Sequence, residues 1–143
     1  MQVHGSCAAR AGFGVLLVGP PGSGKSDLVL RLLDRGFVLV ADDRVEVEDG
    51  LARAPPALAG LLEIRGLGIL RLPYLGAARL ALAARLVSGS EVPRLPERAR
   101  QVFGIPEILV DPRPASAAGL IDRALDTATG RLASVVGAFG ESA

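Results

Sequence analysis

Apolar runs in the first third of the chain flank a glycine-rich segment and one amphipathic stretch. Residues 13–18 form a short apolar run that predicts a buried strand. Residues 26–35 place leucines at helical spacing and precede Gly36, a residue type that commonly ends helices. A second apolar run at residues 37–41 predicts another buried strand. Residues 13–41 therefore read as a βαβ unit, which indicates an α/β fold.

The rest of the chain predicts further short strands and one more helix. Residues 2–10 alternate weakly and predict a strand, and residues 44–53 alternate around Asp49-Gly50, a pair typical of hairpin turns. The next elements are expected to be a short helical turn at 57–62, a glycine-interrupted apolar stretch at 63–72, a strand at 80–87, a polar loop at 88–100 and a strand at 105–110. The strand at 80–87 would carry Leu80, Leu82 and Leu86 on one face. A helix is expected from Ala115 to about Thr127, with an apolar face formed by Ala117, Leu120, Ile121 and Leu125. No helix or strand is predicted after Gly130. Because no linker divides the chain, we expect one domain over residues 1–143.

Composition narrows the class of protein without identifying it. Of the 143 residues, 50% are hydrophobic but only 3% are aromatic, which implies an aliphatic core. The formal net charge of +1 gives no reason to expect a nucleic-acid partner. No apolar run approaches the roughly 20 residues of a membrane span and no signal peptide is seen, so we expect a cytoplasmic protein without membrane contact. Cys7 is the only cysteine, so no intrachain disulfide can form, and we expect this thiol to be inert.

The glycine-rich segment carries the strongest signal for function. It reads Gly19-Pro20-Pro21-Gly22-Ser23-Gly24-Lys25-Ser26, followed by Asp27, and fills every fixed position of the P-loop pattern. Glycines let backbone N–H groups converge on a phosphate, and the next helix points its positive end at the anion. Lys25 is expected to reach the β- and γ-phosphates, and Ser26 to ligate Mg²⁺. The strand before and the helix after argue against a chance match, so the segment predicts a site for a nucleoside triphosphate.

Two acids follow the second buried strand. Asp42 and Asp43 would lie at the strand end beside the P-loop, where carboxylates directed at Mg²⁺ and at catalysis belong. Adjacent side chains on an extended backbone point to opposite sides, so one acid can serve the metal and its waters while the other faces the nucleophile as a base. The alternative is an acidic turn that only caps the strand. Lys25 is the only lysine, so the Asn-Lys-x-Asp motif of GTPases is absent and a small P-loop kinase is favoured.

Four blocks together resemble the catalytic domain of HPr kinase/phosphorylase. They are Val3-His4-Gly5, the P-loop, Leu39-Val40-Ala41-Asp42-Asp43-Arg44-Val45-Glu46 and Leu62-Glu63-Ile64-Arg65-Gly66-Leu67-Gly68-Ile69, the last being the family signature. The resemblance is clear over residues 3–72. It implies a P-loop kinase domain, an α/β fold with a mixed, bent sheet flanked by helices, and phosphorylation of a serine of HPr, the phosphocarrier of the sugar phosphotransferase system. In many members the phosphate is also removed by phosphorolysis.

The resemblance also implies a role for individual residues. Lys25 would contact the phosphates, and Ser26 and Glu63 would bind Mg²⁺, with Asp42 beside them. Asp43 would accept the proton of the substrate serine. His4 would be an active-site residue, and Arg65 would lie on a loop that closes the site. Without the resemblance, Glu63 reads as a solvated surface acid and His4 as a structural or exposed histidine.

The sequence departs from the family pattern in places. The chain starts directly at the catalytic domain, which resembles a short form lacking the N-terminal domain, and Pro20-Pro21 replace the usual Asp and Ser. The family has a later catalytic arginine, and Arg98 is its nearest counterpart here. The family also has a loop tied to dephosphorylation, and the nearest counterpart of that loop is Asp111-Pro112-Arg113-Pro114. Because neither match is good, phosphorylase activity is left open. We expect ATP as phosphoryl donor, Mg²⁺ as cofactor, an HPr-type carrier as partner, and a homo-oligomer, a hexamer by resemblance, with residues 58–75 as contact surface. A P-loop small-molecule kinase and a non-catalytic nucleotide-binding module are the alternatives.

Overall fold

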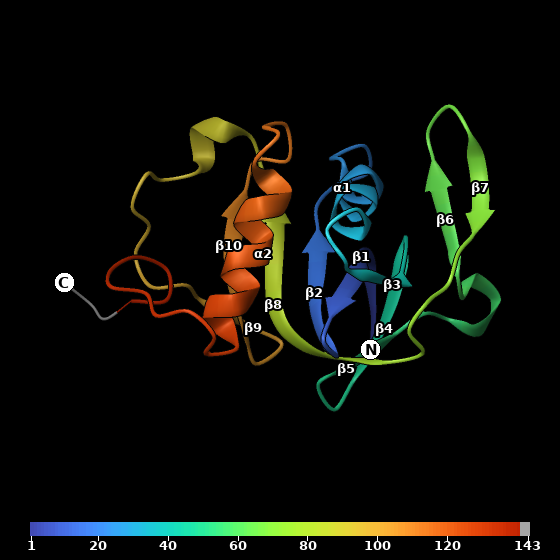
Figure 1. The fold of residues 1–143 in the computed structure, drawn as a ribbon, viewed down its shortest axis with the longest axis horizontal. Helices are drawn as coiled ribbons and strands as arrows, with labels where there is room; N and C mark the ends of the chain where they lie inside the picture. The colour runs from blue at the N-terminus through green and yellow to red at the C-terminus, as the bar shows by residue number, and fades with distance from the viewer. Residues whose placement is uncertain (141–143) are drawn as a thin grey trace.

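A computed structural model of the chain describes residues 1–140, which form strands, two α-helices and two 3₁₀ turns (Figure 1). The strands are β1 (Gln2–Arg10), β2 (Phe13–Val18), β3 (Val38–Ala41), β4 (Arg44–Glu48), β5 (Leu51–Arg53), β6 (Leu61–Ile64), β7 (Gly68–Arg71), β8 (Ala78–Leu86), β9 (Gln101–Val102) and β10 (Ile105–Val110). The helices are α1 (Lys25–Leu33) and α2 (Ala117–Ala128), and the 3₁₀ turns are η1 (Pro56–Leu58) and η2 (Gly89–Glu91). None of the helices in this described part is long and apolar enough to cross a membrane.

The main sheet is mixed and curls back on itself. Its path runs β2-β1-β4-β5-β8-β10-β9, and a further pairing of β2 with β8 closes the first five of these strands into a ring. The pairings β2–β8 and β8–β10 are parallel, and the others along this path are antiparallel. The expected mixed, bent α/β sheet is therefore confirmed.

Strand β1 lies between the two strands of the predicted βαβ unit. Both β2 and β3 pair with β1 in the antiparallel sense, so β2 and β3 are parallel to each other but are not neighbours. Along its other edge, β1 pairs first with β4 through residues 2–4 and then with β3 through residues 7–9. The insertion of β1 brings its residues next to both the P-loop and the acids that follow β3.

Two aliphatic cores lie on the two faces of the sheet. One packs both α-helices against the outer face and includes Leu17, Leu28 and Ile121, among others. The other fills the ring and includes Leu16, Val45 and no helical residue. Because α1 and α2 pack on the same face, the opposite face is covered by the curled sheet itself.

The prediction that Leu80, Leu82 and Leu86 share one face is wrong for Leu80. The pairing of β8 with β2 shifts from Gly14↔Leu80 to Val15↔Leu82, so one extra residue is inserted in β8. One inserted residue moves the side chains that precede it to the other face. Leu80 consequently packs inside the ring, whereas Leu82 and Leu86 pack under the helices.

Helix α2 is confirmed, but Leu120 is not on its buried face. The buried residues are Ala117, Ala118, Ile121, Ala124 and Leu125, and Leu120 is 46% exposed. These five follow the i, i+1, i+4, i+7, i+8 stripe of a helix face, and Leu120 lies outside that stripe. Three alanines in the stripe let α2 lie close to the sheet.

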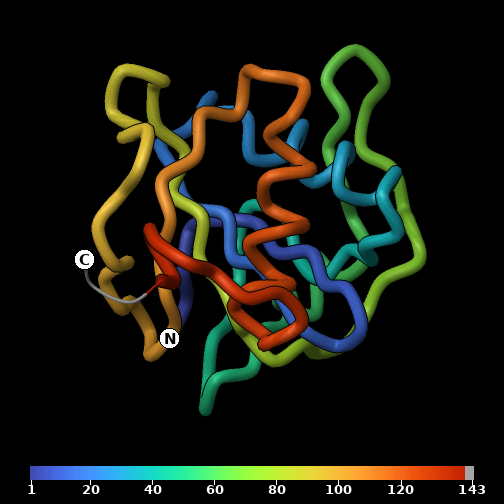
Figure 2. The backbone as a smooth tube through the Cα atoms, turned by 60° about the vertical axis from the view of Figure 1, so that its left-hand side comes forward, coloured from blue at the N-terminus to red at the C-terminus, as the bar shows by residue number. Residues whose placement is uncertain are grey.

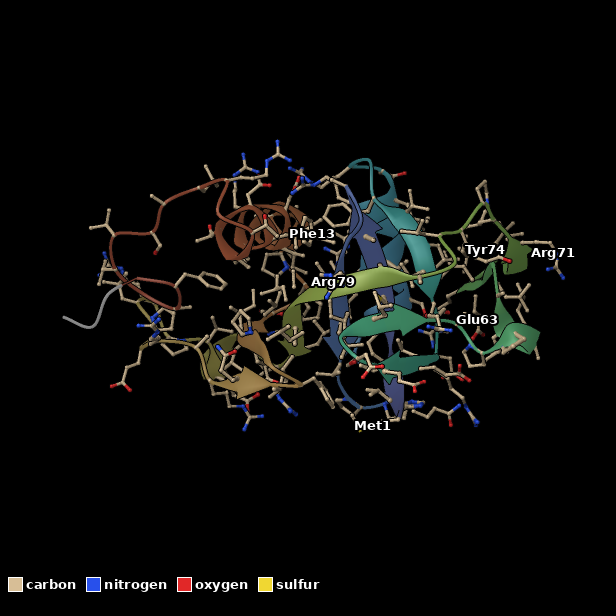
Figure 3. The ribbon with its side chains drawn as sticks, turned by 90° about the horizontal axis from the view of Figure 1, so that it is seen from below. Met1, Phe13, Glu63, Arg71, Tyr74 and Arg79 are labelled. Atoms are coloured by element: carbon tan, nitrogen blue, oxygen red, sulfur yellow. The ribbon has the colours of Figure 1, made fainter. Side chains whose placement is uncertain are left out.

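The signature region forms a hairpin. Strands β6 and β7 pair with each other in a separate two-stranded sheet, from Leu61↔Arg71 to Ile64↔Gly68. The helical turn predicted at 57–62 is present only as η1, and Leu61 and Leu62 belong to strand β6 instead. Leu62 is fully buried in the helix-side core and anchors β6 there. Figure 2 shows this hairpin in green, projecting beside α1, and Figure 3 labels Glu63 and Arg71 on it.

The other boundary predictions agree closely with the structure. The hairpin over residues 44–53 has Asp49 and Gly50 at φ 53° and 77°, the positive values that a two-residue type I′ turn requires. Gly36 has φ 90° just after α1, and Phe37 N–H donates to Leu32 O at 3.2 Å, which is the closing bond of a Schellman motif. Strand β9 was not predicted, since two residues are too few for a periodic signal.

Candidate active site

The P-loop leaves β2 at Val18 and enters α1 at Lys25. Gly22 and Gly24 have φ values of 79° and 101°, a region in which a side chain would be strained. Gly24 is the N-cap of α1, and no side chain caps the helix, so its first N–H groups are not occupied by a protein acceptor. These N–H groups and the positive end of the helix dipole together make an anion site.

Lys25 lies folded over this loop. Its Nζ donates to Gly19 O at 2.7 Å and to Pro20 O at 3.0 Å, and the residue is only 8% exposed. Burial lowers the pKa of Lys25, and the nearby carboxylates of Asp42 and Asp43 oppose part of that shift. The ammonium thus sits inside the loop, where it can exchange a carbonyl partner for a phosphate oxygen.

Ser23 offers a test of whether the loop fits a phosphate. Its Oγ is buried and has no hydrogen-bond partner among the described residues. A Cβ on Gly19 would lie 2.6 Å from this hydroxyl, so the glycine is what leaves room for it. A buried hydroxyl normally has a partner, so this orphaned donor within the P-loop fits an oxyanion bound by the loop.

Asp42 is the central buried acid of the site. It is 8% exposed and accepts a hydrogen bond from Ser26 Oγ, at 2.9 Å to Oδ1 and 3.1 Å to Oδ2. Ser6 Oγ donates to Oδ1 at 2.7 Å, and the N–H of Glu63 lies 3.5 Å from Oδ2. No group of three His, Cys, Asp or Glu side chains in residues 1–140 gathers closely enough to hold a metal alone. Mg²⁺ commonly takes only one or two protein ligands and completes its shell with phosphate and water, so Asp42 and Ser26 fit such an ion.

Asp43 does not lie on an extended backbone, so the prediction that Asp42 and Asp43 point to opposite sides of an extended strand is wrong. Its φ is 70°, and Arg44 N–H donates across it to Asp42 O at 2.8 Å, which makes a three-residue γ-turn. A γ-turn with positive φ at its centre is rare, and such strain costs about 1–3 kcal/mol. The turn is held from β1, because Gly5 N–H donates to Asp43 O at 3.1 Å.

The turn gives the two acids different surroundings. The Asp43 side chain is 64% exposed, and its Oδ1 lies 3.9 Å from Nδ1 of His4, whose side chain is 54% exposed. Asp42, by contrast, is buried between two serines. The two side chains therefore do differ in their surroundings, although a γ-turn and not strand alternation produces the difference; that one serves the metal and the other faces the nucleophile stays a prediction.

One cleft of about 560 Å³ gathers most of the predicted residues. Its lining is His4, Ser6, Pro21, Gly22, Gly24, Lys25, Ser26, Asp27, Leu30, Asp42, Asp43, Glu63, Ile64 and Arg65. Glu63 and Arg65 reach it from the β6–β7 hairpin, and both residues are exposed. Ser6 is the residue that sequence reasoning missed, because a serine in a weakly alternating strand carries no distinguishing signal.

A second cleft, of about 610 Å³, lies on the other side of the P-loop. It is lined by the remaining P-loop residues Gly19, Pro20 and Ser23 and by Asp111, Pro112 and Arg113. The segment after β10 is thus next to the phosphate loop, although it does not line the cleft that holds Asp42 and Asp43. Arg98 lines neither cleft.

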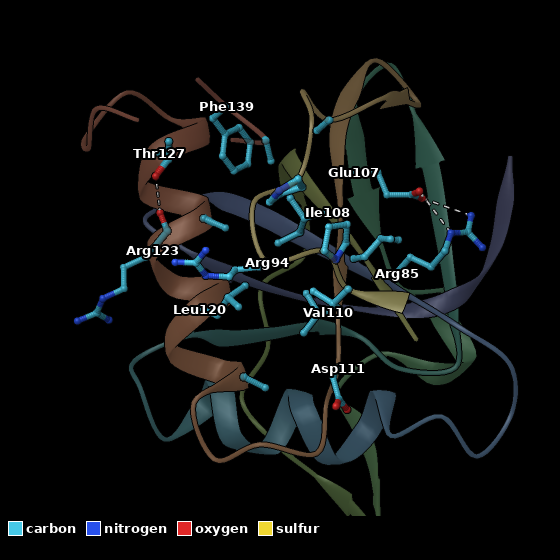
Figure 4. Close-up of a pocket in the computed structure, with 18 of the residues that line it drawn as sticks. Arg85, Arg94, Glu107, Ile108, Val110, Asp111, Leu120, Arg123, Thr127 and Phe139 are labelled. Atoms are coloured by element: carbon cyan, nitrogen blue, oxygen red, sulfur yellow. Dashed lines mark hydrogen bonds and ion pairs between the residues drawn. The ribbon is translucent and has the colours of Figure 1, made fainter. Parts of the chain in front are cut away.

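A third cavity, of about 1030 Å³, lies between α2, β10 and the segment of residues 89–100 (Figure 4). Glu107 lines it and is bound by Arg85 and Arg100, at 3.3 and 2.8 Å. Burial opposes ionisation of Glu107, but these arginines outweigh it, and the pKa of the carboxyl is lowered. This cavity is lined by none of the predicted catalytic residues, whereas the cleft beside the P-loop is lined by all five of them: His4, Lys25, Asp42, Asp43 and Arg65.

The fold and the site together define a class of protein. A strand, a glycine-rich loop and a helix form a phosphate cradle on a mixed sheet, and the buried carboxylate of Asp42 accepts a hydrogen bond from Ser26 of that loop, as in P-loop kinases. The sequence model of the HPr Serine kinase C-terminal domain matches residues 1–81, more than half of the chain. This chain therefore belongs to the HPr serine kinase C-terminal domain family.

Individual relatives agree with that assignment. HPr kinase/phosphorylase 1 of Oceanobacillus iheyensis is 41% identical over 91 residues, covering 60% of this chain and 29% of that protein. HPr kinase/phosphorylase of Lacticaseibacillus casei is 48% identical over 74 residues, covering 48% and 23%. The chain thus spans less than a third of the length of these relatives. The solved structure of the Hpr(Ser) kinase/phosphatase from Coxiella burnetii superposes with a TM-score of 0.75 at 26% identity, over 92% of this chain and 97% of that one.

Proposed function

We propose that residues 1–143 form the catalytic domain of an ATP- and Mg²⁺-dependent protein serine kinase that phosphorylates HPr or an HPr-like phosphocarrier. The observation that carries the proposal is the contrast between the two acids. Asp42 is buried and bonded to Ser26 of the P-loop, whereas Asp43, the next residue, is exposed to the cleft beside His4. Protein kinases use one carboxylate for the metal and a separate one that accepts the proton of the acceptor hydroxyl.

The proposed reaction uses each group once. The P-loop N–H groups and Lys25 bind the β- and γ-phosphates, and Ser26 and Asp42, with Glu63 nearby, would hold Mg²⁺, which neutralises phosphate charge when bound. The carrier serine enters beside Asp43, which takes the proton of its hydroxyl. The serine oxygen then bonds to the γ-phosphorus, and the bond from that phosphorus to the bridging oxygen breaks and releases ADP. A positioned base of this kind contributes about 10²–10⁴-fold.

His4, Glu63 and Arg65 surround the acceptor side of the cleft. His4 lies close enough to Asp43 to orient its carboxylate, at 3.9 Å. Arg65, at the turn of the β6–β7 hairpin, carries a positive charge that can meet the transferred phosphoryl group or the carrier. Because Asp43 and His4 are both more than half exposed, the acceptor side is open, which favours a protein acceptor over a small molecule.

Three further expectations belong to the same proposal. The relatives are called kinase/phosphorylase and kinase/phosphatase, which supports testing removal of the phosphate as well as its transfer. A homo-oligomer, with a hexamer as the form the family resemblance implies, would cover exposed apolar residues of the 58–75 segment such as Leu67 and Ile69, which are 67% and 68% exposed. An ATP-dependent reaction on such a carrier would take place in the cytoplasm.

A transfer assay tests the proposal. The purified protein is incubated with γ-labelled ATP, Mg²⁺ and HPr-type carriers of the same organism, and label on carrier serine is measured. Asp43→Asn is expected to lower the transfer rate at least about 100-fold. Asp49→Asn is the matched control, because Asp49 is also an exposed aspartate at positive φ, 53°, and lies in a turn away from the cleft.

The outcomes separate the candidate functions. The proposal is supported if label reaches a carrier serine, if Asp43→Asn lowers the transfer rate at least about 100-fold, and if Asp49→Asn preserves it. Label that enters only small hydroxyl compounds would support the small-molecule kinase. Tight ATP binding without transfer to any acceptor would support the non-catalytic module. Inorganic phosphate added to the phosphorylated carrier tests the reverse reaction through release of pyrophosphate.

A further inference from the structure

Ser6 is a fully buried polar residue on β1, and its hydroxyl hydrogen-bonds to Asp42. It is 0% exposed, and the residues that follow it on the strand, Cys7 and Ala8, are also buried. Its Oγ donates to Asp42 Oδ1 at 2.7 Å across a separation of 36 residues. Burying a hydroxyl is unfavourable unless it is hydrogen-bonded, and here the partner is a carboxylate, which makes the stronger kind of hydrogen bond.

The Asp42 carboxylate accepts hydrogen bonds from side chains of two elements, α1 and β1. Ser26, at the start of α1, bonds both of its oxygens, but Ser26 follows the P-loop and is also the residue expected to turn toward a metal and nucleotide. Ser6 approaches from β1 and lies opposite Leu17 in the β1–β2 ladder, and its chain neighbours Gly5 and Cys7 are paired with β2 as well. Ser6 is therefore the partner of Asp42 that does not depend on what the loop binds.

The same strand also reaches the second acid. His4 and Ser6 are two residues apart on β1, so their side chains share a face. His4 lies 3.9 Å from Asp43, and Ser6 lies 2.7 Å from Asp42. One strand thus sets the positions of both carboxylates across the γ-turn.

We propose that Ser6 is a positioning residue that holds Asp42 in the orientation in which its carboxylate and the Ser26 hydroxyl can share one Mg²⁺ with the bound nucleotide. This inference rests on the proposed function, since it assigns a role within the same site. Without Ser6, the hydrogen bonds left to Asp42 are those of Ser26 and the long contact from Glu63 N–H at 3.5 Å. The carboxylate would then be free to turn about its side-chain torsions, and the metal-dependent part of nucleotide binding would weaken.

The test compares Ser6→Ala with Cys7→Ala. Both variants remove one γ atom from a fully buried position on the same strand, but the Cys7 side chain packs in the ring core, on the opposite face of the strand from Ser6. Affinity for a fluorescent N-methylanthraniloyl derivative of ATP is titrated with Mg²⁺ and with EDTA. A hydrogen bond to a charged group corresponds to about tenfold, so Ser6→Ala should lose about tenfold of affinity in Mg²⁺ and less than about twofold in EDTA. Cys7→Ala should match the wild type in both.

Two results would overturn the inference. Equal loss in Mg²⁺ and in EDTA would mean that Ser6 only supports the fold, and no loss in either would mean that Asp42 does not need it. Where Ser6→Ala is too unstable to purify, Ser6→Cys keeps the side-chain size while weakening the donor, and the same comparison applies. Because the readout is nucleotide binding, it stands apart from carrier phosphorylation: a protein that phosphorylates no carrier can still show the Mg²⁺-specific loss.

Discussion

Gly5 separates His4 from Ser6 on β1, and replacing it with alanine tests how closely the site depends on strand packing. A Cβ at this position would lie 2.6 Å from Leu17 O, well inside van der Waals contact. The obstacle is a backbone atom of the paired strand β2, which leads directly into the P-loop. It cannot move away as a flexible side chain would, so β1 and β2 have to separate locally.

The magnitude follows from the kind of obstacle. Overpacking a well-filled position costs about 1–3 kcal/mol. For a chain of this size that corresponds to a fall in the melting temperature of about 3 to 10 °C. The same displacement moves His4 and Ser6 relative to the two aspartates, and a shift of about 1 Å in a catalytic arrangement can cost roughly 100-fold in rate. Gly5→Ala should therefore lower both the melting temperature and the transfer rate.

Thermal unfolding and the carrier phosphorylation assay measure the two effects. Gly76→Ala is the matched control, because a Cβ there would meet nothing within 4 Å and the residue is not at positive φ. The reasoning is refuted if Gly5→Ala melts within about 1 °C of Gly76→Ala, since the close contact with Leu17 O would then cost nothing.

Three further predictions concern single residues. Burial raises the pKa of Cys7 from 9.0 to about 12, so the folded thiol keeps a proton that the unfolded one loses. The free energy of unfolding should therefore fall by about 1.6 kcal/mol between pH 9 and 10.5, and urea unfolding should show a smaller fall in Cys7→Ala. Asp43→Gly should abolish transfer yet keep or raise the melting temperature, because relief of about 1–3 kcal/mol of strain exceeds the roughly 0.5–1 kcal/mol entropy cost of glycine; a marked destabilisation would contradict the strained turn. Glu107→Gln should cost about 1–3 kcal/mol at neutral pH, because Arg85 and Arg100 lose their buried partner. The lowered pKa of Glu107 means that its contribution is present above pH 4.5 and is lost as the pH falls further, so urea unfolding of the variant should depend less on acid pH than that of the wild type.

The local elements of this protein could be predicted from the sequence because their causes lie within a few residues. The P-loop needs positive φ at Gly22 and Gly24, and the chain has glycine at both positions. The β4–β5 turn and the end of α1 likewise follow from Asp49-Gly50 and Gly36. The four matching blocks also pointed to the family, since they preserve the order of a known catalytic domain.

The arrangement of the site was decided by the tertiary structure, because it depends on contacts between residues far apart in the chain. The insertion of β1 between β2 and β3 brings Ser6 to Asp42, 36 residues away, and no local pattern marks that pair. The residue inserted in β8 reverses the face of Leu80, since register is set by the partner strand β2. The γ-turn at Asp43 is likewise held by Gly5 of β1. Most residues that line the cleft could therefore be named from the sequence, whereas the packing of β1 against its neighbours decided that Asp42 is buried in the cleft and Asp43 is exposed.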